Sequence, residues 1–397
     1  MTDKKSILLA LQGGGAHGAF TWGVLDTLLA DGRLQFPGIS GTSAGALNAV
    51  ALAHGWAQAE ADQTDPAEGA RASLANLWDK VMTMGSASEP AARLAKLMVG
   101  ALPGAMTHVS PYQTNPLNVN PLLSLIEREI DFDRLARLKA PRVFVAATEV
   151  ETGRAEIFSG KRLTADAVMA SACLPQLFQA PEIDGKLYWD GGYSANPALG
   201  PLIAMGECSD ILVVQINPLK QHGKPTSADQ IHDRVNDLNF NASLIAQMRT
   251  IALLNTSVET GLARAGVQPV RVHRIDGGTA LAGMPAESKV TPNRATVDQL
   301  FALGQESARR WLKRHLSAVG ERGTVNLRRD YGDPFKPEFH AADAASAGGF
   351  DLAPYLWSSP EERARVLDAG SAAKPADATD ETQAAEKASA TERVETP

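Results

Sequence analysis

Apolar residues along this chain follow two alternating patterns, short strand-like runs and longer stretches with helical spacing. Residues 7–11 form a short apolar run, and residues 19–32 follow with apolar positions three and four apart. A second apolar segment around Ile39 leads into an alanine-rich stretch that we expect to form a helix ending near His54 and Gly55. The first quarter of the chain therefore predicts two strand–loop–helix units.

The same alternation returns after residue 140. Apolar or β-rich runs at 142–150, 154–160, 186–192 and 210–216 predict strands, and 164–173 predicts a helix. Strands that alternate with helices favour a mostly parallel sheet with both faces covered. We therefore expect an α/β protein with a three-layer α/β/α architecture.

The composition changes along the chain and suggests its organisation. We expect a catalytic core over 1–217, in which a helical cap is inserted at about 60–125 because loop signals interrupt the helical patches there. A helical C-terminal extension packed on the core should span 218–335, followed by an extended segment over 336–368. Residues 369–397 combine alanine, threonine and charge without any aromatic residue, which predicts a disordered tail.

The extension carries two long helical patterns. Apolar residues at Val235, Leu238, Ala242 and Ile245 recur three and four apart, and 296–316 is amphipathic. The simplest interpretation is that both apolar faces pack against the sheet.

Charge and cysteine content exclude several classes of protein. The formal net charge is −7, and no cluster of lysines or arginines follows one helix, so nucleic acids are not expected as partners. The two cysteines, Cys173 and Cys208, suggest buried thiols in a reducing compartment rather than a disulfide framework or a zinc site. No apolar run has the length of a membrane span or a signal sequence, which favours a cytoplasmic protein.

A short basic amphipathic stretch within the cap suggests how such a protein could contact a membrane. In 91–102, the apolar residues Leu94, Leu97, Met98 and Leu102 fall on one helical face. This face could lie on the inner surface of a membrane, form a lid, or pack as ordinary core. Any membrane contact would be peripheral.

The glycine-rich sequence GGGAHG after the first strand allows two interpretations. Gly13, Gly15 and Gly18 satisfy the dinucleotide pattern G-x-G-x-x-G, which would imply an NAD(P)-dependent oxidoreductase. That pattern also needs an acidic residue at the end of the second strand, whereas Asp31 lies in a turn before it. Alternatively, backbone N–H groups of this loop could stabilise a developing oxyanion.

The sequence GTSAG supports the second interpretation. Gly41, Ser43 and Gly45 fit G-x-S-x-G between a short apolar run and a helix, the setting of a nucleophile elbow. Small residues on both sides of the serine allow a sharp turn that exposes its hydroxyl. The two neighbouring motifs together predict acyl transfer, with Ser43 as nucleophile.

The base that would activate Ser43 is less obvious. None of the eight histidines lies where a triad histidine is usual, and His273, in a strand-like run, is the least implausible of them. Asp190 ends a β-rich run before two glycines and should lie at a carboxyl-terminal strand edge, although Asp-Gly-Gly is more commonly a plain turn. An exposed aspartate is a poor base, so burial would have to raise its pKa.

These residues together resemble the bacterial patatin-like phospholipases. Four motifs carry the resemblance over about residues 6–217: GGGAHG, GTSAG, ASACLP at 170–175 and DGGYSANP at 190–197. The resemblance implies a patatin-like α/β fold and a Ser43–Asp190 dyad without histidine. It also implies an oxyanion hole from the backbone amides of Gly13, Gly14 and Gly15, and lipid acyl hydrolase activity without metal or cofactor.

One departure from the family pattern bears on the substrate. Many members carry arginine or lysine where this chain has His17, so a neutral histidine weakens the case for an anionic phospholipid. The motifs also permit a polyhydroxyalkanoate or a thioester as substrate. A binding or regulatory protein with a degenerate site is a further alternative.

Overall fold

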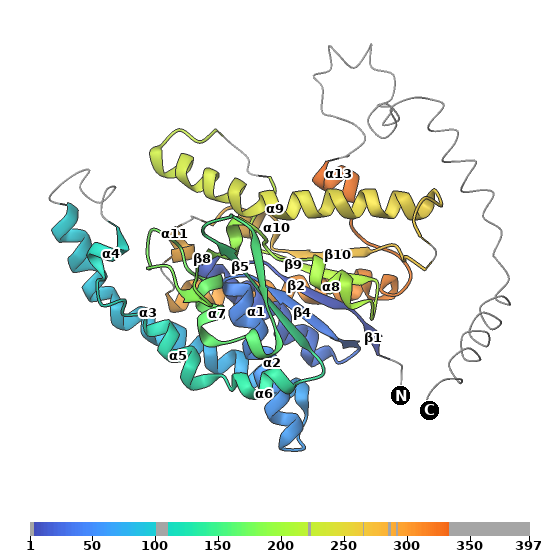
Figure 1. Cartoon of the computed structure of the whole chain (residues 1–397), viewed down its shortest axis with the longest axis horizontal. Helices are drawn as coiled ribbons and strands as arrows, with labels where there is room; N and C mark the ends of the chain where they lie inside the picture. Colours follow the sequence, from blue (N-terminus) through green and yellow to red (C-terminus); the bar gives the residue numbers. More distant parts are fainter. Residues whose placement is uncertain are drawn as a thin grey trace, which may run out of the picture. The chain divides into compact units, whose positions relative to one another are not determined.

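The computed structural model describes residues 4–332 except 101–109, 221–223, 265, 285–286 and 291–292 (Figure 1). The described strands of the main sheet are β2 Leu8–Leu11, β4 Gly38–Gly41, β5 Arg142–Glu149, β6 Ala155–Phe158, β7 Glu182–Ile183, β8 Lys186–Asp190, β9 Asp210–Gln215 and β10 Arg271–Asp276. Two short strands, β1 Lys5–Ser6 and β3 Leu34–Gln35, pair separately.

The described helices are α1 Gly18–Asp31, α2 Ala44–Ala61, α3 Pro66–Gly100, α4 Pro111–Thr114, α5 Pro121–Glu129, α6 Phe132–Arg137, α7 Ala165–Ser171, α8 Gly200–Met205, α9 Ala228–Glu259, α10 Gly278–Ala282, α11 Glu287–Val290, α12 Arg294–His315 and α13 Leu327–Tyr331.

The main sheet has the strand order β10-β9-β2-β4-β5-β8-β7, with β6 also paired to β5. The pairs from β10 to β5 are parallel, whereas β6, β7 and β8 pair antiparallel. The sheet is therefore mixed and mostly parallel, and it confirms the α/β class.

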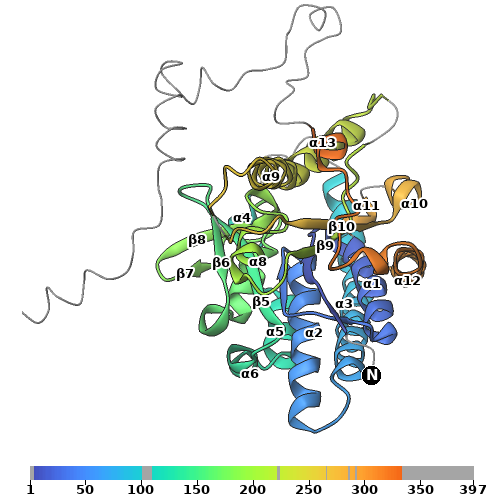
Figure 2. The same cartoon turned by 90° about the vertical axis from the view of Figure 1, so that its right-hand side faces the viewer.

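Helices cover both faces of this sheet, as Figure 2 shows for α9 on one side and α1, α2 and α12 on the other. Side chains of a strand alternate between its two faces. Leu9 and Leu11 of β2 accordingly join the core formed with α1, α2 and α12. Leu8 and Ala10 join the core on the opposite face, with α8 and α9. Burial on both faces explains why this strand is continuously apolar.

The segment after residue 217 differs from the helical extension that we expected. Strand β10 pairs in parallel with β9 and extends the main sheet, and the core strand β9 thereby has neighbours on both sides. The predicted segments 336–368 and 369–397 lie outside the described residues.

Two helix predictions were wrong in detail. Helix α2 does not end near Gly55 but continues to Ala61. A Cβ at Gly55 would lie 2.2 Å from the carbonyl oxygen of Gly69, so this glycine permits close contact with α3 and does not mark a helix end.

Of the apolar face predicted for α9, only Ile245 packs against the core. Val235 and Leu238 are 47% and 51% exposed, whereas Leu244 and Met248 are fully buried against the sheet. Three of the four predicted positions lie before Leu244, whereas the apolar core contacts of this 32-residue helix begin at Leu244. Amphipathic spacing alone could not indicate which part of the helix has a packing partner.

None of the helices in the described part of the chain is both long enough and apolar enough to cross a bilayer.

Helices α1 and α12 approach each other through a pair of glycines. A Cβ on Gly23 would lie 2.0 Å from the carbonyl oxygen of Phe301, and one on Gly304 would lie 2.1 Å from that of Phe20. Each glycine therefore allows the backbone of the facing helix to come into contact.

We predict that Gly304→Ala lowers the free energy of unfolding by about 1–3 kcal/mol, because the added methyl group must separate two packed helices. Urea denaturation measures this change. Gly200→Ala is the matched control, because its Cβ would meet nothing within 4 Å, and it should leave stability equal or slightly higher. Equal stability of the two variants would contradict the predicted contact.

Candidate active site

Ser43 occupies a sharp turn between β4 and α2. Its backbone has φ 54° and ψ −121°, a strained conformation for a residue with a side chain. A Cβ on Gly41 would lie 2.4 Å from the carbonyl oxygen of Gly45, and one on Gly45 would lie 2.1 Å from that of Leu11. The two glycines of GTSAG are thus required by close backbone contacts, as a nucleophile elbow demands.

Hydrogen bonds from distant segments hold this turn. The N–H of Ser43 donates to Oγ of Ser171 at 2.8 Å, and Oγ1 of Thr42 donates to the carbonyl oxygen of Ala195 at 2.7 Å. Ser171 belongs to the ASACLP motif and Ala195 to DGGYSANP. Two of the four motifs noted in the sequence therefore support the elbow directly.

Asp190 reaches the same edge of the sheet, but by a different route from the one we predicted. It ends β8, which runs antiparallel to β5 and pairs Asp190 with Ala147. Asp190 is therefore not at the carboxyl end of a parallel strand. Strand β8 begins beyond the end of β5 and runs back along it, so Asp190 lies near the edge where β4 and β5 end. The Asp190 backbone is held by its N–H bond to Cys173 O at 2.7 Å and by the bond from Thr148 Oγ1 to its carbonyl at 2.8 Å.

The structure brings the Ser43 hydroxyl and the Asp190 carboxyl together. Asp190 is only 1% exposed, and burial raises its pKa to about 7. Hydrogen bonds from the N–H of Gly192, at 2.7 Å, and from the Ser43 hydroxyl lower the pKa and partly offset this effect. A carboxyl group with this pKa is a far better proton acceptor near neutral pH than an exposed aspartate.

The glycine loop lies beside Ser43 and Asp190, and the role expected for Gly13 in the oxyanion hole needs correction. The N–H of Gly13 donates to Oδ1 of Asn196 at 2.7 Å, so this amide is already bonded and does not point to an oxyanion. Gly13 has a steric role instead, since a Cβ there would lie 2.8 Å from Cβ of Ser43. The N–H groups of Gly14 and Gly15 have no acceptor among the described residues. These two amides are available to a ligand.

A network of buried amide side chains fixes the loop, and our sequence analysis did not assign it. Oε1 of Gln12 accepts bonds from the N–H groups of Ile216 and Asn217, and its Nε2 donates to Asn241 at 3.0 Å. Nδ2 of Asn217 donates to the carbonyl oxygen of Gly13 at 2.7 Å. The available signal was Gln12 directly after the apolar strand β2 and Asn217 two residues after the end of β9.

Ser43 and Asp190 open into a cavity of about 340 Å³ with mainly apolar walls. The apolar side chains come from α2, α3, α5, α9 and the loop after α7: Leu47, Leu77, Trp78, Val81, Leu122, Leu174, Leu177, Phe178 and Phe240. Such walls suit a hydrocarbon chain next to Ser43 and Asp190.

Neither the alternative base His273 nor Asp31, the acidic residue considered for a dinucleotide, lies at this site. His273 bonds to Asp210 at 2.9 Å and to Thr324 at 3.1 Å, and none of the histidines among the described residues lines the cavity. Asp31 forms an ion pair with Arg33 at the end of α1 opposite the glycine loop, about 20 Å away for 14 helical residues. It cannot contact a ribose bound at that loop.

His17 is buried beneath the glycine loop rather than exposed to the cavity. Its Nε2 lies 2.7 Å from Oγ of Ser288. Burial, and secondly the positive charge of Lys289, lower its pKa to about 4. The residue is therefore neutral at physiological pH, as the sequence suggested.

The two cysteines are free thiols. Cys173 is buried, and burial together with the nearby charge of Asp190 raises its pKa to about 12. Cys208 is partly buried. The apolar face at Leu97 and Met98 in the cap lies outside the residues whose side chains are described.

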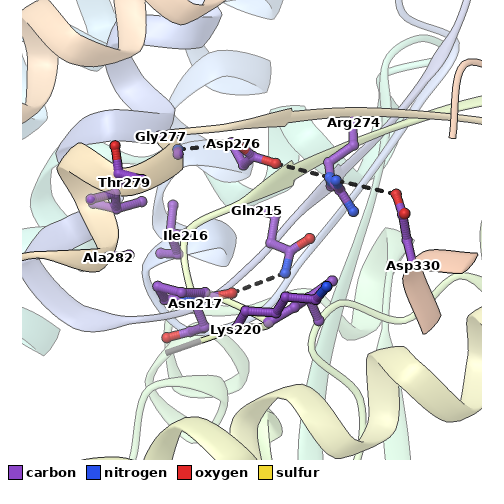
Figure 3. A pocket seen from close by; sticks show the side chains of 14 residues that line it. Gln215, Ile216, Asn217, Lys220, Arg274, Asp276, Gly277, Thr279, Ala282 and Asp330 are labelled. Carbon is purple, nitrogen blue, oxygen red and sulfur yellow. Dashed lines mark hydrogen bonds and ion pairs between the residues drawn. The ribbon is translucent and has the colours of Figure 1, made fainter. Parts of the chain in front are cut away.

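A second cavity of about 340 Å³ adjoins the first at Asn217 but has a different character (Figure 3). Charged side chains point toward it, and Arg274 forms ion pairs with Asp276 at 2.9 Å and Asp330 at 3.4 Å. Neither Ser43 nor Asp190 contributes to its walls.

We predict that Ser171→Ala lowers the free energy of unfolding by about 1–3 kcal/mol, because it leaves the buried N–H of Ser43 unpaired. Ser40→Ala removes another fully buried hydroxyl, one without a partner among the described residues, and should cost much less. Urea denaturation of both variants makes the comparison; a larger loss for Ser40→Ala would contradict it.

The segment that contains Ser43 and Asp190 is similar to known proteins. A family model described as patatin-like phospholipase matches residues 9–203. No curated protein matches the sequence. Similar solved structures include VipD from Legionella pneumophila, with 16% identity, coverage of 79% of this chain and 67% of VipD, and a TM-score of 0.37.

The type III effector ExoU is also similar, with 17% identity over 94% of this chain and 92% of that one and a TM-score of 0.28. Full-length ExoU in complex with SpcU, from Pseudomonas aeruginosa, gives 15% identity over 92% and 88% and a TM-score of 0.29.

Proposed function

This chain belongs to the patatin-like phospholipase family of lipid acyl hydrolases, and on that premise we propose that it cleaves fatty-acyl esters of phospholipids with a Ser43–Asp190 dyad. The observation that carries the proposal is the buried Asp190 carboxyl group, hydrogen-bonded to the Ser43 hydroxyl at an apolar cavity. Family membership also removes the oxidoreductase alternative. The alternative of a binding or regulatory protein with a degenerate site is disfavoured because Ser43 and Asp190 are both present and hydrogen-bonded to each other.

The reaction would proceed by double displacement. Asp190 accepts the proton of the Ser43 hydroxyl while Oγ attacks the ester carbonyl carbon, and the carbonyl oxygen becomes an oxyanion. The N–H groups of Gly14 and Gly15 would donate to that oxyanion. When the tetrahedral intermediate collapses, the C–O bond to the alcohol breaks and the alkoxide takes the proton from Asp190.

The second half repeats these steps with water. Asp190 removes a proton from a water molecule that attacks the acyl-enzyme, and the Ser43 oxygen leaves and recovers the proton. The fatty acid is released and the free enzyme is restored. The apolar walls of the cavity would hold the acyl chain throughout.

We predict that Ser43→Ala lowers kcat for p-nitrophenyl butyrate by at least about 10³-fold. The variant lacks the nucleophilic oxygen and retains only substrate binding and the oxyanion hole. The same variant should lose labelling by a fluorophosphonate probe, which peptide mapping should locate at Ser43 in the unmodified protein. Asp190→Asn, which cannot accept a proton, should lose most of the activity and the labelling. Full activity of either variant, with native circular dichroism as the control for folding, would refute the dyad.

The pH dependence provides an independent test. Asp190 must be ionised to act as a base, and its pKa is raised to about 7. We therefore expect kcat/KM to be constant above about pH 8 and to fall about tenfold per pH unit below pH 6. A profile that is flat down to pH 5, with the protein still folded, would exclude Asp190 as the base.

A further inference from the structure

The cavity at Ser43 carries one cationic side chain among the described residues that line it. Asp190 and Lys289 are its charged members, and Lys289 comes from α11, far along the chain from the family motifs. Its Nζ donates to Oδ1 of Asp237 at 2.7 Å and to Oδ1 of Asn217 at 3.0 Å. An ammonium group has three donors, so these two acceptors leave one N–H for a ligand.

Helix α11 is attached directly to the glycine loop. A Cβ on Gly15 would lie only 2.2 Å from the carbonyl oxygen of Lys289, and His17 contacts Ser288 at 2.7 Å. Asn217 connects the same two segments, because its Nδ2 donates to the carbonyl oxygen of Gly13 while its Oδ1 accepts from Lys289. The ammonium is therefore held on the side of the cavity where the free amides of the glycine loop lie.

His17 does not supply this positive charge, because it is buried and neutral. The side chain of Lys289 remains 21% exposed, whereas its partner Asp237 is 13% exposed. The cation is thus the more accessible member of the pair. A phosphate next to an ester bound at Ser43 could reach it.

We propose that Lys289 binds the phosphate of the phospholipid and makes the enzyme prefer phosphate-bearing esters to neutral ones. This inference rests on the proposed function and specifies its substrate. In a phospholipid, the glycerol carbons separate the phosphate from the ester carbonyl by only a few bonds. A cation beside the oxyanion donors can therefore bind the phosphate while Ser43 attacks the ester, and a Lys–phosphate contact is a strong, charge-assisted hydrogen bond.

The test compares two substrates with the same acyl chain, monomeric dihexanoyl phosphatidylcholine and p-nitrophenyl hexanoate. For Lys289→Met, we expect the ratio of kcat/KM for the phospholipid to that for the neutral ester to fall about 10- to 100-fold. Most of the loss should be in KM, since the phosphate contact is made in both the bound substrate and the transition state. Lys289→Arg, which retains the charge, should recover most of the ratio.

Two controls separate this role from a structural one. Lys220→Met removes a lysine from the neighbouring cavity shown in Figure 3 and should leave the ratio unchanged. Asp237→Asn breaks the same ion pair but keeps the ammonium, so it should not lower the ratio. An unchanged ratio for Lys289→Met, or an equal fall for Asp237→Asn, would overturn the proposal and leave Lys289 as a link between α9 and α11.

The outcome is independent of the dyad. Loss of activity toward both esters in Ser43→Ala, together with an unchanged ratio in Lys289→Met, would retain the proposed function and reject only the phosphate site. Full activity in Ser43→Ala would reject the proposed function itself.

Discussion

The site depends on the close approach of two loops that leave neighbouring parallel strands. Strands β2 and β4 pair in register with Leu11 beside Gly41, so the glycine loop and the elbow begin side by side. The contact is so close that a Cβ on Gly13 would lie 2.8 Å from Cβ of Ser43. Glycine is needed at such contacts because any side chain would separate the loops. The strained backbone of Ser43 persists because the close contacts at Gly41 and Gly45 and the bond from its N–H to Ser171 fix it.

The second constraint is the burial of Asp190. An ionised carboxylate in an apolar environment is unfavourable, and the same desolvation raises its pKa to about 7. Two hydrogen-bond donors, Gly192 and Ser43, compensate in part. The arrangement that costs stability is thus the one that would make Asp190 an effective base in the proposed dyad without histidine.

The second half of the chain completes the site rather than merely covering it. Helix α9 provides Asn241 to Gln12 and the carbonyl oxygen of Phe240 to Asn196, and both bonds support the glycine loop. Helix α11 packs its backbone against Gly15. The segment matched by the family model contains Ser43, Asp190 and the glycine loop, to which we assign the proposed dyad and oxyanion hole. Later helices hold these residues and add the only cation among the described lining residues.

The sequence by itself determined the strand–loop–helix order, the elbow around Ser43 and the candidate base Asp190, because these depend on local spacing and on small residues at fixed positions. It could not assign the bonded state of the Gly13 amide, the buried half of α9 or the route of β8 to the sheet edge. Each depends on a partner distant in sequence: Asn196 for Gly13, the sheet for Leu244 and Met248, and β5 for Asp190. Only the tertiary structure decided that Lys289 shares a cavity with Ser43, because no local pattern encodes the proximity of a helix near residue 289 to a loop near residue 14.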